Sequence, residues 1–170
     1  MADFDVVIIG GGPGGYVAAL RAAQLGMRTA LVERERVGGL CLNWGCIPSK
    51  ALLWNAEIVN LARQGETWGI SYENLHVDPA KAVDRSRKVV ERIVSGVEFL
   101  LKKHGVTLVQ GAGRLAGGGR VTVSPSGDEL QASAVIVATG ARPRSLPGIE
   151  ADGQVVITSR EALALRETPQ

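Results

Sequence analysis

Residues 6–15 read Val-Val-Ile-Ile-Gly-Gly-Gly-Pro-Gly-Gly, an apolar run that leads directly into a glycine turn. The first four residues are typical of a strand that is buried on both faces of a parallel sheet. Residues 16–25 are rich in alanine, follow a helical pattern and end at Gly26, a residue type that commonly terminates helices. Residues 29–32 then predict a second strand. Together these segments predict a βαβ unit at the start of an α/β domain.

The glycine turn fits the pattern G-x-G-x-x-G from Gly10 to Gly15. Such a turn lets backbone N–H groups approach a pyrophosphate, and the helix that follows aims its positive end at the same group. Glu33 ends the second predicted strand, where a carboxylate can accept hydrogen bonds from ribose hydroxyls. The pattern indicates a dinucleotide site without separating FAD from NAD. A purely structural turn with a solvated Glu33 is the alternative, whereas a Walker phosphate loop is excluded because no Lys-Ser/Thr follows.

The chain has two cysteines, in the segment Cys41-Leu-Asn-Trp-Gly-Cys46. A continuous helix would separate their Cα atoms by about 7.5 Å, beyond the ~7 Å that a disulfide spans. If the two cysteines pair, the segment must bend, and Gly45 permits the bend. Pro48 predicts a helix over about residues 47–63, which places Cys46 at its N-terminus, where the pKa of a thiol falls. Such a pair can cycle between dithiol and disulfide.

Two other interpretations of the cysteines remain open. They could be unpaired buried thiols, or they could bind zinc together with His76 and His104. The zinc interpretation is disfavoured because C-x4-C with two distant histidines fits no usual zinc spacing. We therefore predict no metal site.

The rest of the chain continues the α/β alternation. Residues 80–104 form the clearest amphipathic helix, and the glycine-rich residues 113–131 predict a small antiparallel meander. The other expected elements are a connection over 64–77, strands over 106–109, 134–138 and 155–157, and a helical turn opening at Ser159 with Glu161 as a cap. The predicted fold is a doubly wound, Rossmann-like α/β domain with a parallel sheet and a small antiparallel meander.

A third motif, Val-Ile-Val-Ala-Thr-Gly over residues 135–140, ends a predicted strand with small residues. Ligands of open α/β sheets bind at the carboxyl ends of the strands, so this motif supports the site at the glycine turn. By itself it is equally typical of a plain strand end. Residues 111–116 match G-x-G-x-x-A, but strand-like residues follow them instead of a helix, and we do not predict a second dinucleotide site there.

Composition excludes several classes of partner. The 170 residues include 19 basic and 17 acidic side chains, and no basic stripe with interleaved aromatic residues indicates nucleic-acid binding. No segment approaches the ~18 apolar residues of a membrane span. The first residues carry no basic region ahead of their apolar run, so we expect a cytoplasmic protein. In that compartment a purely structural disulfide is disfavoured.

Four parts of the sequence together resemble the pyridine nucleotide-disulfide oxidoreductases. They are Gly10–Gly15, Glu33, residues 38–53 (Gly-Gly-Leu-Cys-Leu-Asn-Trp-Gly-Cys-Ile-Pro-Ser-Lys-Ala-Leu-Leu) and residues 138–143 (Ala-Thr-Gly-Ala-Arg-Pro). Within that family, the run Ile-Pro-Ser-Lys-Ala-Leu-Leu is most similar to the dihydrolipoamide dehydrogenases. Glutathione reductases usually carry Val-Pro-Lys-Lys there, and mercuric reductases a variant with Val-Pro. The sequence departs from the family at Leu40, where Thr is usual, and at Trp44, where Val is common.

The resemblance implies a role for each matching residue. Cys41 would be the interchange thiol that meets the substrate, and Cys46 the thiol that faces the flavin. The residues implied to bind FAD are Gly10, Gly12, Pro13, Gly14 and Gly15 at the pyrophosphate, Glu33 at the ribose, Gly113 at the adenine, Gly39, Leu40, Cys41 and Lys50 near the flavin, and Thr139, Gly140 and Ala141 at a later flavin-nucleotide contact.

The resemblance also implies the reaction and the partners. Dihydrolipoamide, free or on the lipoyl domains of 2-oxo acid dehydrogenase complexes, would reduce the disulfide, the disulfide would reduce FAD, and FAD would reduce NAD⁺ in a homodimeric enzyme. Residues 1–146 would form the FAD-binding domain and 147–170 a connector stub. Rival interpretations are a reductase of glutathione or mercuric ion, and a non-catalytic FAD-binding remnant or split-enzyme subunit. Since the family's NAD, central and interface domains have no counterpart in these residues, we expect no complete turnover by this chain alone.

Overall fold

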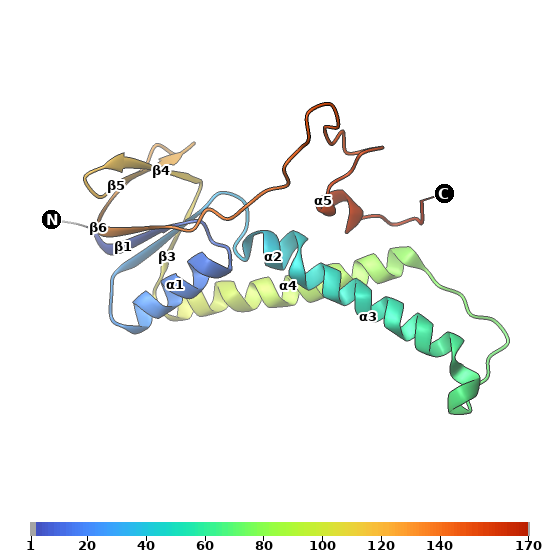
Figure 1. Cartoon of the computed structure of the whole chain (residues 1–170). Helices are drawn as coiled ribbons and strands as arrows, with labels where there is room; N and C mark the ends of the chain where they lie inside the picture. The colour runs from blue at the N-terminus through green and yellow to red at the C-terminus, as the bar shows by residue number, and fades with distance from the viewer. Residues whose placement is uncertain (1–2, 170) are drawn as a thin grey trace. The chain divides into compact units, whose positions relative to one another are not determined.

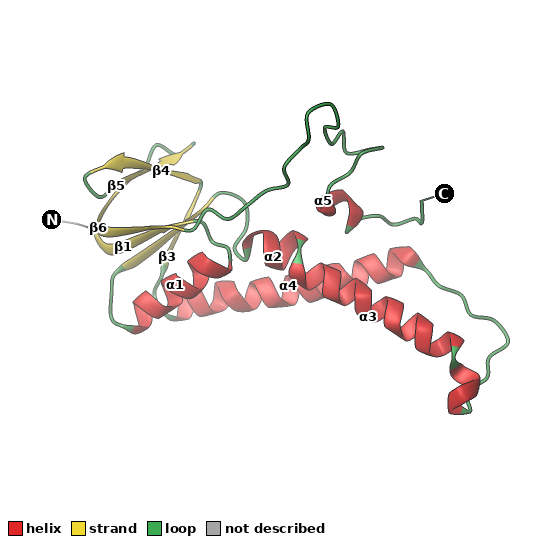
Figure 2. Cartoon of the chain, viewed as in Figure 1, coloured by secondary structure: helices red, strands yellow, loops and turns green. Residues whose placement is uncertain are grey.

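The computed structural model describes residues 3–169, which form two compact units. The first unit comprises the residues up to Asn43 together with Arg92–Arg142, and the second comprises Trp44–Glu91 together with the residues from Pro143 onward. Figure 1 follows the order of the elements along the chain, and Figure 2 marks helices, strands and loops by colour. The strands belong to the first unit, and the second unit is built from helices and loops.

The first unit is built on a six-stranded sheet with the order β3-β2-β1-β6-β5-β4. Strands β1, β2, β3 and β6 are parallel, and the β4–β5 and β5–β6 pairs are antiparallel. Helix α1 (Pro13–Gln24) connects β1 to β2, so the predicted βαβ unit is confirmed. The strands are β1 (Phe4–Ile9), β2 (Thr29–Glu33), β3 (Thr107–Gln110), β4 (Ala112–Gly117), β5 (Arg120–Ser124) and β6 (Glu129–Val137). A mostly parallel α/β sheet with an antiparallel meander was the predicted fold class, and it is confirmed.

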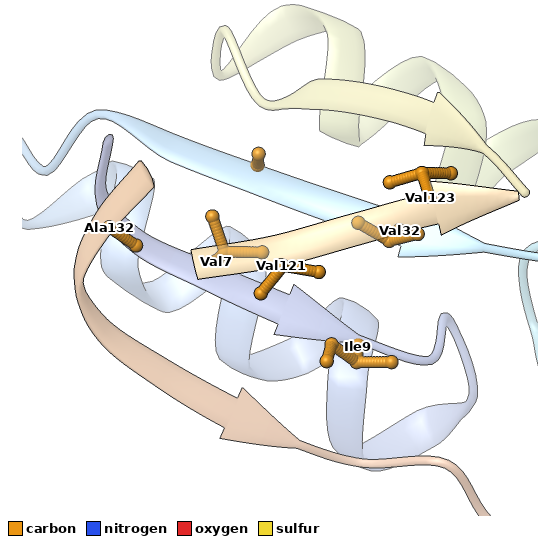
Figure 3. Packing of buried hydrophobic residues seen from close by; sticks show 7 residues of the cluster. Val7, Ile9, Val32, Val121, Val123 and Ala132 are labelled. Atoms are coloured by element: carbon orange, nitrogen blue, oxygen red, sulfur yellow. The ribbon is translucent and has the colours of Figure 1, made fainter. Parts of the chain in front are cut away.

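The apolar run of β1 is continuous because both faces of the sheet are covered. On one face, Val7 and Ile9 pack in a buried cluster with Val121 and Val123 of β5, as Figure 3 shows. On the other face, Ile8 lies beside α1, since a Cβ atom built on Gly15 would come within 3.5 Å of its Cγ2 atom. The meander therefore covers one face of the strand and the helix covers the other.

Helix α4 (Pro79–Lys103) confirms the predicted amphipathic helix. Its part from Arg92 onward belongs to the first unit and lies on the same side of the sheet as α1 (Figure 1). This part buries Val94, Val97 and Leu101, whose spacing of three and four residues keeps them on one face of the helix. Within residues 3–169, no helix combines the length and the apolar character that crossing a membrane requires.

The second unit contains α3 (Cys46–Arg63), the short 3₁₀ helix η1 (Gly65–Trp68), the first part of α4, and α5 (Ser159–Ala162). The predicted turn at Ser159 is confirmed, and its N-terminus forms a capping box between Thr158 and Glu161. The strand predicted over residues 155–157 is wrong. The Oδ1 atom of Asp152 accepts hydrogen bonds from the N–H groups of residues 154, 155 and 156, so these groups close a turn instead of pairing with a strand.

We expect the contact between α1 and β1 to be sensitive to a single methyl group. A Cβ atom on Gly15 would overlap the carbonyl oxygen of Gly10, whereas one on Gly14 meets nothing within 4 Å. Gly15→Ala should therefore lower the free energy of unfolding by about 1–3 kcal/mol. Gly14→Ala is the matched control and should leave it unchanged or raise it by up to about 1 kcal/mol. Urea unfolding followed by circular dichroism measures both, and equal stability of the two variants would contradict the packing argument.

Candidate functional site

The candidate site lies where the parallel strands of the first unit end. The N–H of Gly10 donates to the carbonyl of Val32 at 2.8 Å, and the N–H of Ala138 donates to the carbonyl of Ile9 at 2.8 Å. These bonds bring the glycine turn after β1 and the segment after β6 to the edge at which β2 ends in Glu33. The structure thus gathers three of the segments that the sequence had singled out.

Glu33 is buried and braces the glycine turn. Its Oε2 atom accepts a hydrogen bond from the N–H of Gly11 at 2.6 Å, and its Oε1 atom accepts one from the N–H of Glu35 at 2.8 Å. A Cβ atom added to Gly11 would lie 3.1 Å from Oε2 of this carboxylate. A larger residue at position 11 would therefore require the Glu33 side chain to move by a few tenths of an ångström. Sequence reasoning missed this bracing role, because only the ribose contact was foreseen; the ribose contact itself stays a prediction.

The four glycines expected at the pyrophosphate fall into two classes. Gly10 and Gly15 are required by the protein itself, because an added Cβ would overlap the backbone oxygen of Ala138 or Gly10, respectively. Gly12 and Gly14 have no such requirement, because neither has a positive φ. A Cβ atom added to Gly14 would meet nothing within 4 Å, and one added to Gly12 would meet only the Cα atom of Gly39, at 3.9 Å. Protein packing therefore does not explain the second pair.

The N-terminus of α1 provides a second observation at the same place. Gly12 is its N-cap residue and supplies no side-chain cap, and Pro13 occupies the first helical position. An uncapped helix start with open space beside its glycines fits an anionic ligand, because backbone N–H groups and the positive end of the helix both point outward there. The donor set therefore fits the pyrophosphate of a dinucleotide.

A loop packs closely on this turn. The N–H of Gly38 donates to the carbonyl of Gly11 at 2.8 Å, and a Cβ on Gly39 would lie 2.7 Å from the Cα of Gly12. The buried Asn43 holds the loop, since its Nδ2 atom donates to the carbonyls of Val37 and Gly39 at 3.1 and 3.0 Å. We had not singled out Asn43 from the sequence. Its position between the two cysteines was the available signal.

The two cysteines form a disulfide, which excludes the interpretation as unpaired thiols. Helix α2 (Gly39–Trp44), which the sequence did not predict, carries Cys41, and α3 begins at Cys46. Gly45 lies between them with φ −143° and ψ −107°, so the bend that pairing requires occurs where it was expected. Cys46 is exposed at the start of a helix without a side-chain cap, whereas Cys41 is half-buried.

The remaining predicted residues are placed as follows. Gly113 lies in β4 over the ends of β1 and β2, where an added Cβ would be 3.0 Å from Ile9 and 3.2 Å from Val32. Thr139, Gly140 and Ala141 follow β6 and are exposed, as are Pro13 on α1 and Leu40 on α2. Lys50 belongs to the second unit, exposed on α3 one turn after Cys46. Among residues 3–169, no group of three or more His, Cys, Asp or Glu side chains could hold a metal ion.

Comparison with known proteins identifies close relatives. The chain is 51% identical to the dihydrolipoyl dehydrogenase of Chlorobaculum tepidum over 99% of its length, and 46% identical to that of Bacillus subtilis over 99%. The crystal structure of LpdA from Mycobacterium tuberculosis superimposes with a TM-score of 0.86, at 28% identity over 95% of this chain. The chain spans about 37% of the length of the first of these relatives and of the LpdA chain.

A family model settles the classification. The model described as "Pyridine nucleotide-disulphide oxidoreductase" matches residues 4–170, and this agrees with the resemblance expected from the cysteine segment and the glycine turn. The chain is a homologue of dihydrolipoyl dehydrogenases, and it belongs to the pyridine nucleotide-disulphide oxidoreductases.

Proposed function

We propose that this chain is the FAD-binding, disulfide-bearing part of a dihydrolipoyl dehydrogenase, with residues 1–146 as the FAD-binding domain and 147–170 as a connector. The observation that carries the proposal is the packing of Gly39 on Gly12. It joins the loop that leads into Cys41 to a glycine turn whose open side fits a pyrophosphate. Both of these relatives are dihydrolipoyl dehydrogenases, which supports the choice of a lipoyl dithiol over glutathione or mercuric ion.

Each binding residue has a proposed task. The N–H groups at the start of α1, beside Gly12 and Gly14, bind the pyrophosphate, and free lone pairs of the Glu33 carboxylate accept from the ribose. The backbone of Gly113 contacts the adenine. Lys50 and the residues 139–141 complete the flavin contacts. When bound, FAD supplies the two-electron chemistry that links a dithiol to a pyridine nucleotide, with NAD⁺ as the proposed final acceptor.

The disulfide itself performs the first half of the reaction. A thiolate of dihydrolipoamide attacks the Sγ of Cys41, the Cys41–Cys46 bond breaks, and Cys46 leaves as a thiolate. The second substrate thiol, as its thiolate, then attacks the substrate sulfur bound to Cys41, which closes the cyclic disulfide of lipoamide and releases Cys41. Two electrons pass from the substrate to the protein. The start of α3 favours this direction because a helix N-terminus stabilises the departing Cys46 thiolate.

The cofactor assignment predicts what the glycine turn binds. Protein purified after incubation with FAD should release flavin on heating, identified by its absorption spectrum. Gly14→Ala should raise the Kd for FAD by at least tenfold, about 1.4 kcal/mol, because the methyl group enters the open space. Gly96→Ala is the matched control, since it places the same methyl group in open space on α4. A nicotinamide with no flavin, or equal affinity in the two variants, would contradict the assignment.

The substrate assignment predicts how the disulfide is reduced. Dihydrolipoamide should convert each chain to two alkylatable thiols and yield one lipoamide. Glutathione at the same thiol concentration should reduce the chain less completely, because only a dithiol resolves its mixed disulfide intramolecularly. Alkylation followed by mass spectrometry counts the thiols. A disulfide that resists dihydrolipoamide while glutathione reduces it would reject the lipoyl assignment.

The roles of the two thiols predict their order of ionisation. In the reduced protein, the rate of alkylation by iodoacetamide should reach half of its maximum at a lower pH for Cys46 than for Cys41, because only Cys46 begins a long helix. The single variants Cys41→Ser and Cys46→Ser allow each midpoint to be measured separately. The pH midpoint, unlike the absolute rate, does not depend on the greater exposure of Cys46. A lower midpoint for Cys41 would exchange the proposed roles.

A further inference from the structure

Trp44 lies between the two half-cystines in the sequence, and its indole is in contact with two cations. The guanidinium of Arg87 lies 4.7 Å from the centroid of a Trp44 ring, and that of Arg160 lies 4.5 Å from it. Arg87 comes from α4 and Arg160 from α5, and all three residues belong to the second unit. Cation–π contacts of this kind are attractive, so the indole joins two segments that are more than seventy residues apart in the sequence.

The segment around α5 has a second anchor on α4. Arg166 forms a two-pronged ion pair with Asp84, in which Nη2 donates to Oδ2 at 3.1 Å and Nη1 to Oδ1. Hydrogen bonding to Arg166 lowers the pKa of Asp84, which keeps the carboxylate ionised. Asp84 and Arg87 are three residues apart on α4 and therefore lie on the same face. Residues 158–166 are thus fixed at two points, and one of them is the Trp44 ring.

We propose that Arg87 and Arg160 are positioning residues for the redox pair, which act through Trp44 to hold the segment between the cysteines in the conformation of the closed disulfide. The inference rests on the redox role proposed above. Trp44 precedes the bend at Gly45, so a fixed indole restricts the backbone on one side of that bend. The coupling is reciprocal. If the closed disulfide stabilises the docked α5 by a given free energy, then docking of α5 stabilises the closed disulfide by the same free energy.

The coupled reaction is the reversible reduction of the protein disulfide by a dithiol. The dithiol gives up two electrons and two protons and closes its own S–S bond, while the Cys41–Cys46 bond breaks. One of these protons is transferred to Cys41 and the other passes to solvent, while Cys46 is left as a thiolate. Breaking the disulfide opens the ring that it closes over residues 41–46. The contacts of Arg87 and Arg160 with Trp44 then oppose rearrangement of this segment without the covalent bond.

The test measures the thiol–disulfide equilibrium of the full chain in buffers of reduced and cyclic oxidised dithiothreitol, with thiols counted by alkylation and mass spectrometry. Arg160→Met and Arg87→Met should shift the equilibrium toward the dithiol by about two- to tenfold, a rise in reduction potential of about 9–30 mV. Arg144→Met is the control, since it removes the same charge from the exposed C-terminal segment, and it should match the wild type.

The sign of the shift separates positioning from electrostatics. A nearby cation stabilises a thiolate, so loss of its charge alone would favour the disulfide, in the direction opposite to the one expected. Arg160→Lys retains the cation for the indole and should restore at least part of the wild-type equilibrium. A shift toward the disulfide in Arg160→Met, or no shift relative to Arg144→Met, would overturn the inference.

Hydrogen exchange supplies a second readout. Reduction should speed amide exchange in residues 158–166 of the wild type, whereas in Arg160→Met the exchange should be fast in both redox states. Exchange in β1 should be the same in all variants, which shows that the first unit retains its fold. Equal amide exchange rates for residues 158–166 in the oxidised and the reduced wild type would overturn the inference. A wild-type disulfide that never reaches equilibrium with the dithiol would instead refute the redox role on which it rests.

Discussion

The close approach of α1 to the end of β1 is the contact on which the candidate site depends. Gly15 passes the carbonyl of Gly10 so closely that no side chain fits between them, and Gly10 in turn lies against the backbone of Ala138. This packing brings the start of the helix to the carboxyl edge of the parallel sheet. The same two elements therefore form the core of the first unit and the open, uncapped helix start that fits a pyrophosphate.

The edge of the sheet is held by buried polar groups as well as by packing. Glu33 accepts hydrogen bonds from the backbone on both carboxylate oxygens, and Asn43 donates twice to the loop that begins α2. Buried polar groups are costly when they are unsatisfied, so these side chains favour one conformation of the turn and of the loop. The glycine turn and the segment that carries Cys41 are consequently fixed by one connected set of contacts.

The disulfide requires an interruption of helical structure, and the chain provides it at Gly45. Helix α2 ends at Trp44 and α3 begins at Cys46, so the two cysteines lie on different helices. In the second unit, Trp44 adds long-range contacts to this local geometry through Arg87 and Arg160. The segment between the cysteines therefore carries both the bend that the disulfide requires and the contact between Trp44 and Arg160 of α5.

The amino-acid sequence by itself determined the features that depend on local spacing. These are the βαβ unit around the glycine turn, the amphipathic pattern of α4, and a helix start near residue 47, one residue from the observed start of α3. Periodicity, proline and glycine act over a few residues, and Gly45 likewise permitted the bend that pairing of the cysteines would require. The tertiary structure alone decided which distant groups meet. These contacts are the bracing of the glycine turn by Glu33, the hydrogen bonds of Asn43, the packing of the meander over Val7 and Ile9, and the arginine contacts of Trp44. It also decided the turn at Asp152, where a side chain accepts the N–H hydrogen bonds that a strand would have used. No local pattern records which distant partner a side chain will meet, or whether a side chain will displace a strand as the partner of the backbone.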